Sequence, residues 1–307
     1  MQATWMLLAT LFFAFMGICI KLASPYFSPA ELVFYRGLIS AFLLYLLARS
    51  QGVTLKTRFP VMHAWRSLIG VSSMGGWFYA ISYLPLATAV TLNYMSSIWI
   101  ATFIVGSALL TWRPAGRAPA PAPSLLAQGP LAATVILGFI GVILMLRPSW
   151  APEQLFAGVV GLMAGLMAAF AYMQVVALAR VGEPETRTVF YFAFGCAVAG
   201  GLVALLQGFS PWDWRGAIWL IPIGVLAALA QLCMTFAYSR SQGQAGTLFV
   251  ANLQYSGIIF SSVLALLIFG ERIPLIGWAG MILIVISGII ASILRVRLAP
   301  AAPAEER

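Results

Sequence analysis

The chain has 307 residues, of which 62% are hydrophobic and only 8% are charged, and its formal net charge is +9. Soluble globular proteins are about 45–50% apolar and about 25% charged, so this composition excludes a soluble domain. The basic residues lie between long apolar runs and form no amphipathic face, which excludes a nucleic-acid-binding surface and indicates a membrane protein.

Ten apolar runs follow one another along the chain, each close to the roughly 20 residues that cross a bilayer as a helix. Because the runs are continuous rather than alternating, they predict helices and an all-α integral membrane fold. Proline, glycine and charged residues separate most of the runs. The ten predicted spans are 3–23, 30–49, 63–83, 86–110, 130–147, 155–179, 187–207, 216–238, 245–269 and 274–295.

Two segments outside the spans are unlike the rest of the chain. Residues 113–129, between the fourth and fifth spans, are rich in alanine and proline and predict a cytoplasmic linker that does not continue a helix. Residues 299–307 have a similar composition and predict a disordered tail.

The positions of lysine and arginine orient the spans. Twelve of these residues, Arg66 among them, lie on the side of the N-terminus, whereas Lys21, Arg147, Arg215 and Arg272 lie on the other. Cytoplasmic loops carry an excess of lysine and arginine. We therefore expect both termini in the cytoplasm and a multi-pass protein of the bacterial inner membrane.

The two halves of the chain share short motifs in the same order. Val-Phe-Tyr at 33–35 recurs at 189–191, and Leu-Asn-Tyr at 92–94 is matched by Leu-Gln-Tyr at 253–255. Each repeat contains five helices. Because five is an odd number of membrane crossings, the second copy must insert upside down, as in many transporters. The predicted units are a first repeat, 1–147, and a second repeat, 148–298.

Longer stretches resemble the EamA-type members of the drug/metabolite transporter superfamily. They are SPAELVFYRGLISAFLL at 28–44, ILGFIGVILMLRP at 136–148, and LQYSGIIFSSVLALLIFGE with GWAGMILIVISGII from 253 onward. The resemblance covers almost the whole chain and implies ten helices, with spans five and ten supporting the bundle at its edge. The family often ends its fourth span with a Gly-Glu pair like 270–271, whereas this chain has Thr-Trp-Arg at 111–113.

Charged residues inside the spans are scarce. Arg36, about six residues into the second span, is the clear case. A buried charge seeks a partner, so Arg36 or Lys21 pairs with Glu31 at the same membrane face, or Arg36 lies near an outer gate and meets a substrate carboxylate. No aspartate or glutamate falls at mid-membrane, which argues against carboxylate-based proton antiport and against strongly cationic substrates.

Amides and aromatic rings within the spans predict a substrate cavity. Amides are costly in lipid unless they hydrogen-bond, and rings can pack the apolar part of a ligand. The alternative is that these groups only join helices through hydrogen bonds. A wider set includes Trp77 and Gln254, and the residues predicted to line the cavity are Arg36, Tyr79, Tyr83, Asn93, Tyr94, Ser97, Trp99, Tyr172, Gln174, Gln231, Asn252 and Tyr255.

Catalytic and metal sites are not expected. His63, at the cytoplasmic start of the third span, has no carboxylate or cysteine close to it in sequence, so we interpret it as a loop residue near lipid headgroups. Cys19, Cys196 and Cys233 lie within apolar runs and are interpreted as small buried residues. The chain is therefore predicted to be no enzyme and to use neither a cofactor nor a metal.

These features together predict a secondary transporter that exports small metabolites by alternating access, with spans one to four rocking against spans six to nine. The aromatic lining and a resemblance to aromatic amino acid exporters of the same superfamily favour neutral or aromatic amino acids. The protein would act in the lipid bilayer as a monomer or homodimer. The alternatives are a multidrug or metabolite efflux carrier, a carrier of nucleotide-linked metabolites and, more remotely, a membrane assembly protein that transports nothing.

Overall fold

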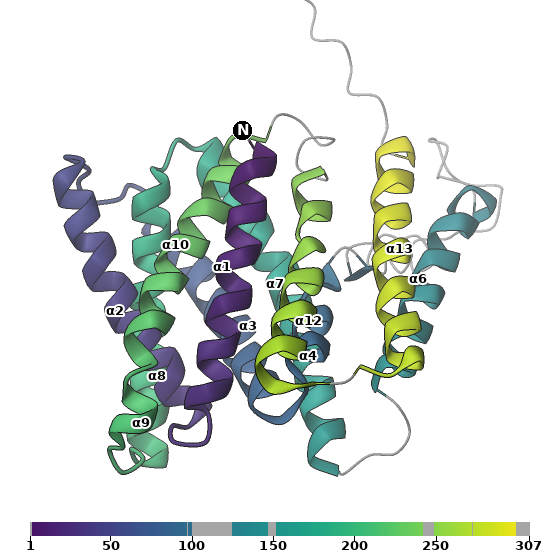
Figure 1. The fold of residues 1–307 in the computed structure, drawn as a ribbon. Helices are drawn as coiled ribbons and strands as arrows, with labels where there is room; N and C mark the ends of the chain where they lie inside the picture. The colour runs from purple at the N-terminus through teal and green to yellow at the C-terminus, as the bar shows by residue number, and fades with distance from the viewer. Residues whose placement is uncertain are drawn as a thin grey trace, which may run out of the picture.

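The computed structural model describes residues 2–96, 98–99, 125–146, 152–241, 249–271 and 273–298. Every regular element in those ranges is a helix, which confirms the all-helical prediction (Figure 1). The helices are α1 (Gln2–Ala23), α2 (Pro29–Ser50), α3 (Pro60–Tyr83), α4 (Leu86–Asn93), α6 (Leu125–Leu146), α7 (Pro152–Arg180), α8 (Glu185–Gln207), α9 (Trp214–Ala217), α10 (Leu220–Ser239), α12 (Ser256–Phe269) and α13 (Leu275–Leu298).

Six helices in the described ranges are long and apolar enough to cross a membrane, among them α1, α2, α7 and α8. The helix α1 begins and α13 ends on the same side of the molecule, as both predicted cytoplasmic ends require (Figure 1). Most of the predicted linker and the whole predicted tail lie outside the described residues, but α6 begins at Leu125, within the predicted linker.

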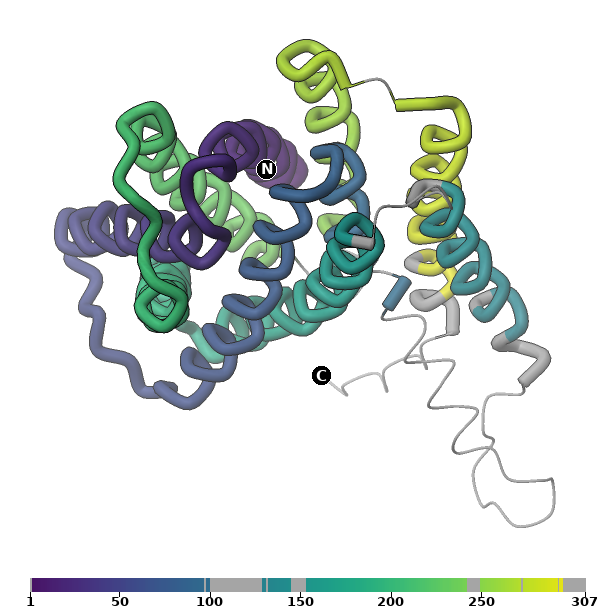
Figure 2. The backbone as a smooth tube through the Cα atoms, turned by 90° about the horizontal axis from the view of Figure 1, so that it is seen from below, coloured from purple at the N-terminus to yellow at the C-terminus, as the bar shows by residue number. Residues whose placement is uncertain are grey.

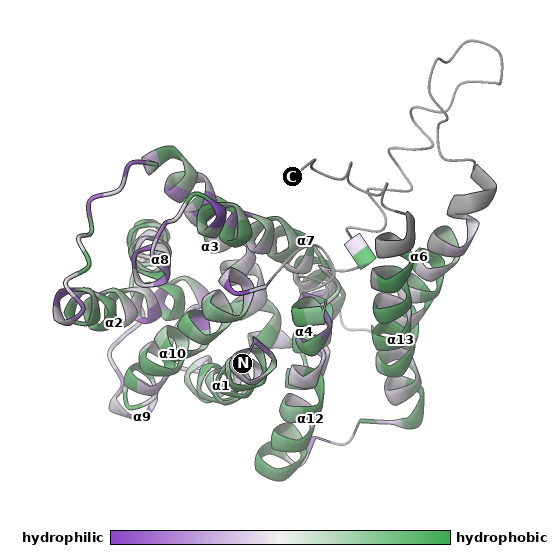
Figure 3. Ribbon diagram, turned by 90° about the horizontal axis from the view of Figure 1, so that it is seen from above, coloured by the Kyte–Doolittle hydropathy of each residue, from purple (hydrophilic) through white to green (hydrophobic). Residues whose placement is uncertain are grey.

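Hydropathy differs between the helices and the loops. Hydrophobic residues extend along α6, α12 and α13, whereas hydrophilic residues gather in the loop from α2 to α3 (Figure 3). Many large apolar side chains on the outer surface are exposed, Leu206 and Leu275 most of all at 87% and 88%. In a membrane these surfaces face lipid, so their exposure carries no penalty.

The start of α2 shows how a helix end fixes a buried acid. Ser28 accepts a hydrogen bond from the Glu31 N–H at 3.3 Å, and the Ser28 N–H donates to the Glu31 carboxylate at 2.7 Å, a reciprocal capping box. Ser210 donates both its N–H and its hydroxyl to the same carboxylate, at 2.8 and 2.6 Å. The expected pairing of Glu31 with Arg36 or Lys21 is therefore wrong, because these local donors occupy the carboxylate.

The fourth and ninth spans are both interrupted, at corresponding places in the two halves. The helix α4 ends at Asn93 and the chain turns at Tyr94, while the ninth span turns at Gln254–Tyr255 before α12. At both turns backbone N–H groups bond to carbonyls three residues back, as in a 3₁₀ turn. The two Leu-Asn/Gln-Tyr motifs therefore mark helix breaks inside the membrane.

The helices pack in pairs that join the two halves of the chain. The helix α2 packs on α8, α1 on α10, α3 on α7 and α6 on α13 (Figure 2). Small residues allow the closest approach: a Cβ added at Gly37 of α2 would meet the backbone of α8 at Ala197 and lie 2.7 Å from the Ala193 oxygen. The α2–α8 pair forms one edge of the bundle, where α2 contacts α10 and α8 contacts α3 (Figure 3).

Candidate functional site: a polar cavity at the helix breaks

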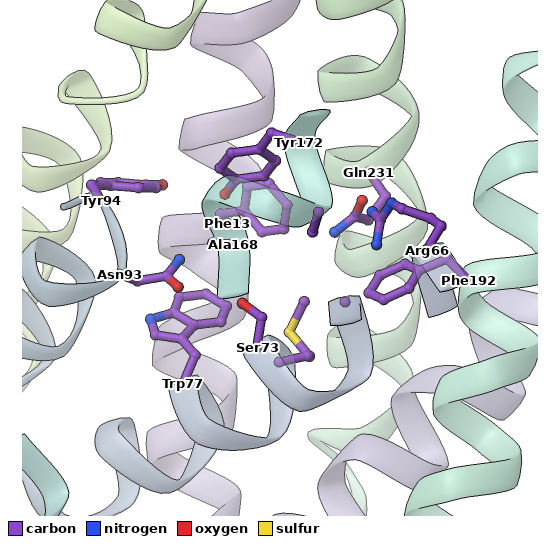
Figure 4. A pocket seen from close by; sticks show the side chains of 13 residues that line it. Phe13, Arg66, Ser73, Trp77, Asn93, Tyr94, Ala168, Tyr172, Phe192 and Gln231 are labelled. Atoms are coloured by element: carbon purple, nitrogen blue, oxygen red, sulfur yellow. The ribbon is translucent and has the colours of Figure 1, made fainter. Parts of the chain in front are cut away.

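A narrow cavity lies between the α1–α10 pair and the α3–α7 pair. One wall is the turn after α4, and another is the face of α8 that carries Phe192 (Figure 4). Its free volume of about 30 Å³ holds roughly two water molecules, so a metabolite can enter only if the helices separate. The lining side chains labelled in Figure 4 are Phe13, Arg66, Ser73, Trp77, Asn93, Tyr94, Ala168, Tyr172, Phe192 and Gln231.

One face of α3 supplies the largest share of this lining. Arg66, Gly70, Ser73 and Trp77 recur at steps of three and four residues, so they lie above one another on the helix. A Cβ at Gly70 would overlap the Arg66 guanidinium and approach the Phe192 ring to 2.7 Å. The glycine therefore leaves the space into which Arg66 folds back over its own helix.

Several polar atoms of the cavity have no hydrogen-bond partner. They are Nε and Nη1 of Arg66, Nε1 of Trp77, Oδ1 of Asn93 and Oε1 of Gln231, and each of these side chains is at least nine-tenths buried. Buried polar groups in proteins are normally paired. An enclosed cluster of unpaired donors and acceptors is a surface suited to bind a polar ligand.

The structure brings four of the predicted site residues into the cavity: Asn93, Tyr94, Tyr172 and Gln231. Tyr94 packs edge-on over Gly257 at the start of α12, where a Cβ would lie 2.7 Å from the tyrosine ring. Tyr172 stacks on Tyr238, with the ring centroids 5.7 Å apart.

Other predicted residues lie elsewhere. Tyr79 and Tyr83 contact each other and line a separate, mostly apolar hollow between α2, α3 and α8, which we call the lipid-side hollow because it is open at the apolar surface of the bundle. The indole N–H of Trp99 donates to the Leu162 carbonyl at 3.1 Å, which holds it against α7. Tyr255 is buried against Gly288 of α13. Gln174 and Asn252 are half-buried outside the cavity lining, and Ser97 lies outside the described residues.

Two arginines lie in surroundings that differ from those predicted from the sequence. Arg36 is buried but does not line the cavity; its Nη1 donates to the Cys196 sulfur at 3.0 Å behind the Phe192 ring. From the sequence, Arg66 counts only as a topology signal on the cytoplasmic side, yet it is 3% exposed and lines the cavity. Its spacing of four and seven residues from Gly70 and Ser73 is the sequence signal that could have placed it.

Polar clusters lie at both ends of the helix bundle. At the end predicted to face outward, Lys21 Nζ lies 2.5 Å from Glu271 Oε1 and 3.0 Å from the Leu84 carbonyl, while the other Glu271 oxygen accepts the Leu86 N–H at 3.1 Å. This cluster joins the end of α1 to the start of α4 and the end of α12.

At the predicted cytoplasmic end, in what we call the cytoplasmic cluster, Glu183 accepts hydrogen bonds from Thr57 at 2.8 Å and from Arg187 at 3.0 Å, and it bonds to His63 at 3.1 Å. The interpretation of His63 as a headgroup-facing loop residue is therefore wrong, because the side chain is 2% exposed and its ring packs at a tilt against Tyr191. Burial raises the pKa of the Glu183 carboxyl, but these hydrogen bonds outweigh it and hold the pKa below its ordinary value.

The comparisons with known proteins agree with this architecture. The profile of the EamA-like transporter family matches residues 1–114. A pseudopaline exporter, CntI, of Pseudomonas aeruginosa is 31% identical over 287 residues, which cover 93% of each chain. The chain belongs to the EamA-like transporter family. It is therefore a multi-pass membrane transporter of small metabolites and not an enzyme.

More distant relatives of this family member extend over similar lengths. An uncharacterized transporter of Helicobacter pylori is 27% identical and covers 94% of this chain and 93% of its own. An S-adenosylmethionine uptake transporter of Rickettsia prowazekii is 22% identical and covers 87% and 84%. A solved crystal structure with 19% sequence identity superposes with a TM-score of 0.65 over 97% of this chain and 99% of that one, which supports the fold.

Proposed function

We propose that this family member is a secondary carrier of the bacterial inner membrane that exports neutral or aromatic amino acids by alternating access. The observation that carries the proposal is the cavity of rings and unpaired amides beside the break after α4. Interrupted helices at the interface between repeats form the substrate sites of many secondary transporters. Rings can pack an amino acid side chain while amides orient its polar end.

The packing supports two related repeats, 1–147 and 148–298. If the repeats are equivalent, exchanging α1 with α7, α2 with α8 and α3 with α10 must convert each contact into another contact. The α1–α10 contact becomes α7–α3, and the α2–α10 contact becomes α8–α3, both of which occur. The breaks at Tyr94 and Tyr255 are likewise exchanged.

The same packing changes the expected motion. Rocking spans one to four against six to nine would separate α1 from α10, α2 from α8 and α3 from α7, which are among the most extensive interfaces. We therefore propose that the α1–α10 pair and the α3–α7 pair move as units about the α2–α8 pair, which contacts both. The cavity lies between these two units, and the Lys21–Glu271 and His63–Glu183 clusters close its opposite ends.

The direction of transport follows the more similar named relative. The 31% identical Pseudomonas protein is named an exporter, whereas the 22% identical Rickettsia protein is named an uptake transporter. Within the described residues, no aspartate or glutamate lines the cavity. We therefore propose facilitated exchange or downhill export rather than carboxylate-based proton antiport.

The test is flux of labelled solutes into proteoliposomes that contain the purified protein, with and without a pH gradient. The panel holds phenylalanine, leucine, a quaternary ammonium drug and a nucleoside. Saturable amino acid flux that ignores the gradient supports the proposal. Flux of the drug alone would support the efflux alternative, and flux that requires the gradient would overturn the proposed coupling.

A further inference from the structure

Arg66 is the most unusual group in the cavity. It is 3% exposed, it lines the cavity directly, and its Nε and Nη1 atoms have no hydrogen-bond partner. Its guanidinium carbon lies 4.3 Å from the centre of the Phe192 ring. The side chain is therefore fixed by an aromatic face and by the space above Gly70, with N–H groups left available to a ligand.

A second buried guanidinium increases the positive charge beside the cavity. Arg36 lies 5.0 Å from the centre of the same Phe192 ring, and its hydrogen-bonding neighbour is the Cys196 sulfur. One ring thus packs against two cations. An aromatic face attracts a cation, but it does not neutralise two of them.

No carboxylate of the described chain pairs with either arginine. Glu31 is taken by Ser28 and Ser210, and Glu183 by the cytoplasmic cluster. Glu271 pairs with Lys21, and the contact between His63 and Glu183 is a hydrogen bond within the cytoplasmic cluster. A buried charge within a membrane is costly unless it is paired. Water can accept an arginine N–H, but it brings no opposite charge.

We propose that Arg66 binds a carboxylate of the transported metabolite. The inference names a substrate class for the same cavity and so rests on the proposed transport function. A carboxylate can accept two N–H bonds from one guanidinium, and its negative charge balances the Arg36–Arg66 pair. Gln231 lies beside Arg66, and Asn93 and Trp77 lie across the cavity from it (Figure 4). The rest of the substrate would extend toward Asn93 and Trp77.

Matched ligands distinguish the contribution of the carboxylate to binding from that of the rest of the substrate. Phenylalanine and leucine are compared with phenylalanine amide and leucine amide, which keep the side chain and amine but lack the negative charge. Inorganic phosphate is added to test whether any anion suffices. Binding is measured as the shift in melting temperature of the detergent-purified protein, and flux is measured in proteoliposomes.

The variants are Arg66→Gln, Arg66→Lys and the control Arg58→Gln, which removes an exposed arginine near the same cytoplasmic end. We expect Arg66→Gln to weaken phenylalanine binding at least tenfold, Arg66→Lys to weaken it less, and Arg58→Gln to leave it unchanged. Neither Arg66 substitution should alter the weak binding of the amides. Because Arg66→Gln removes an unpaired buried charge, the variant should fold.

The possible results distinguish carboxylate binding by Arg66 from the proposed transport function. Equal loss of carboxylate and amide binding in Arg66→Gln would overturn the inference, because it would show a structural role. Transport only of solutes without a carboxylate would also overturn it, while leaving the carrier function standing. Carboxylate binding that depends on Arg66 without any flux would support the inference and contradict the proposed function. Equal binding of phosphate would show a general anion site and overturn carboxylate recognition.

Discussion

Lys21 and Glu271, which are 250 residues apart in the sequence, form an ion pair of 2.5 Å at the predicted outer end of the helix bundle. The same carboxylate accepts the backbone N–H of Leu86 at the start of α4. One acid therefore joins three helices, α1, α4 and α12, at the end of the bundle through which substrate would leave under the proposed export.

Removal of the charge of Glu271 should favour outward opening. Glu271→Gln would release Lys21 at a cost of roughly 1 kcal/mol, the upper range for a partly exposed ion pair, which corresponds to about a fivefold change in population. Cys19, two residues before Lys21 and 7% exposed, should then react about fivefold faster with an impermeant maleimide added outside, as read by peptide mass spectrometry. The exposed Glu153 provides the control Glu153→Gln; equal labelling of both variants would contradict the gate.

The cytoplasmic cluster should make stability depend on acid pH. The folded-state pKa of Glu183 lies below its ordinary value of 4.5, so its contribution is complete above pH 4.5 and is lost as the pH falls through the folded-state pKa. Glu183→Gln should lower the melting temperature at pH 7, because hydrogen bonds to a charged group contribute about 1.5–3 kcal/mol each.

The melting temperature of wild type and Glu183→Gln is to be measured between pH 7 and pH 3.5. The difference between them should shrink toward the acid end, because protonation removes the same charge that the substitution removes. A difference that stays constant across this range would show that the cluster stabilises the protein by packing alone.

Filling the space at Gly257 should impair transport without unfolding the protein. A Cβ there would lie 2.7 Å from the Tyr94 ring, so Gly257→Ala must displace a ring that lines the cavity. Gly75→Ala is a matched control, because nothing lies within 4 Å of a Cβ at that helical position. Flux of the transported solute should fall in Gly257→Ala and stay unchanged in Gly75→Ala. The Gly75→Ala substitution should stabilise its helix by about 0.5–1 kcal/mol.

Asn93 and Tyr83 should respond differently although the sequence assigned both to the cavity. Asn93 lines the cavity and is 8% exposed, whereas Tyr83 is 47% exposed and lines the lipid-side hollow. Asn93→Ala should reduce flux roughly two- to tenfold, the effect of one lost hydrogen bond. Tyr83→Ala should leave flux within the error of the assay; the reverse ranking would place the substrate in the hollow instead.

The sequence alone established that the chain lies in a lipid bilayer, and it established much of the architecture. Its apolar runs must be helices because lipid offers no partner for backbone N–H and C=O groups. The motifs that end in Tyr94 and Tyr255 indicated a repeat, and they mark helix breaks in the two halves. Each of these inferences depends on local composition or on the order of residues along the chain, and both are fixed before the chain folds.

Only the tertiary structure decided which polar residues meet. Arg66 lies near a helix end, where an arginine can equally face headgroups or turn inward; packing of α7 and α8 against α3 encloses it. Glu183 reaches His63 across 120 residues, and Tyr79 faces away from Asn93 although both belong to apolar spans. Such pairings depend on how helices rotate against one another, because burial and charge compensation are properties of neighbours distant in sequence.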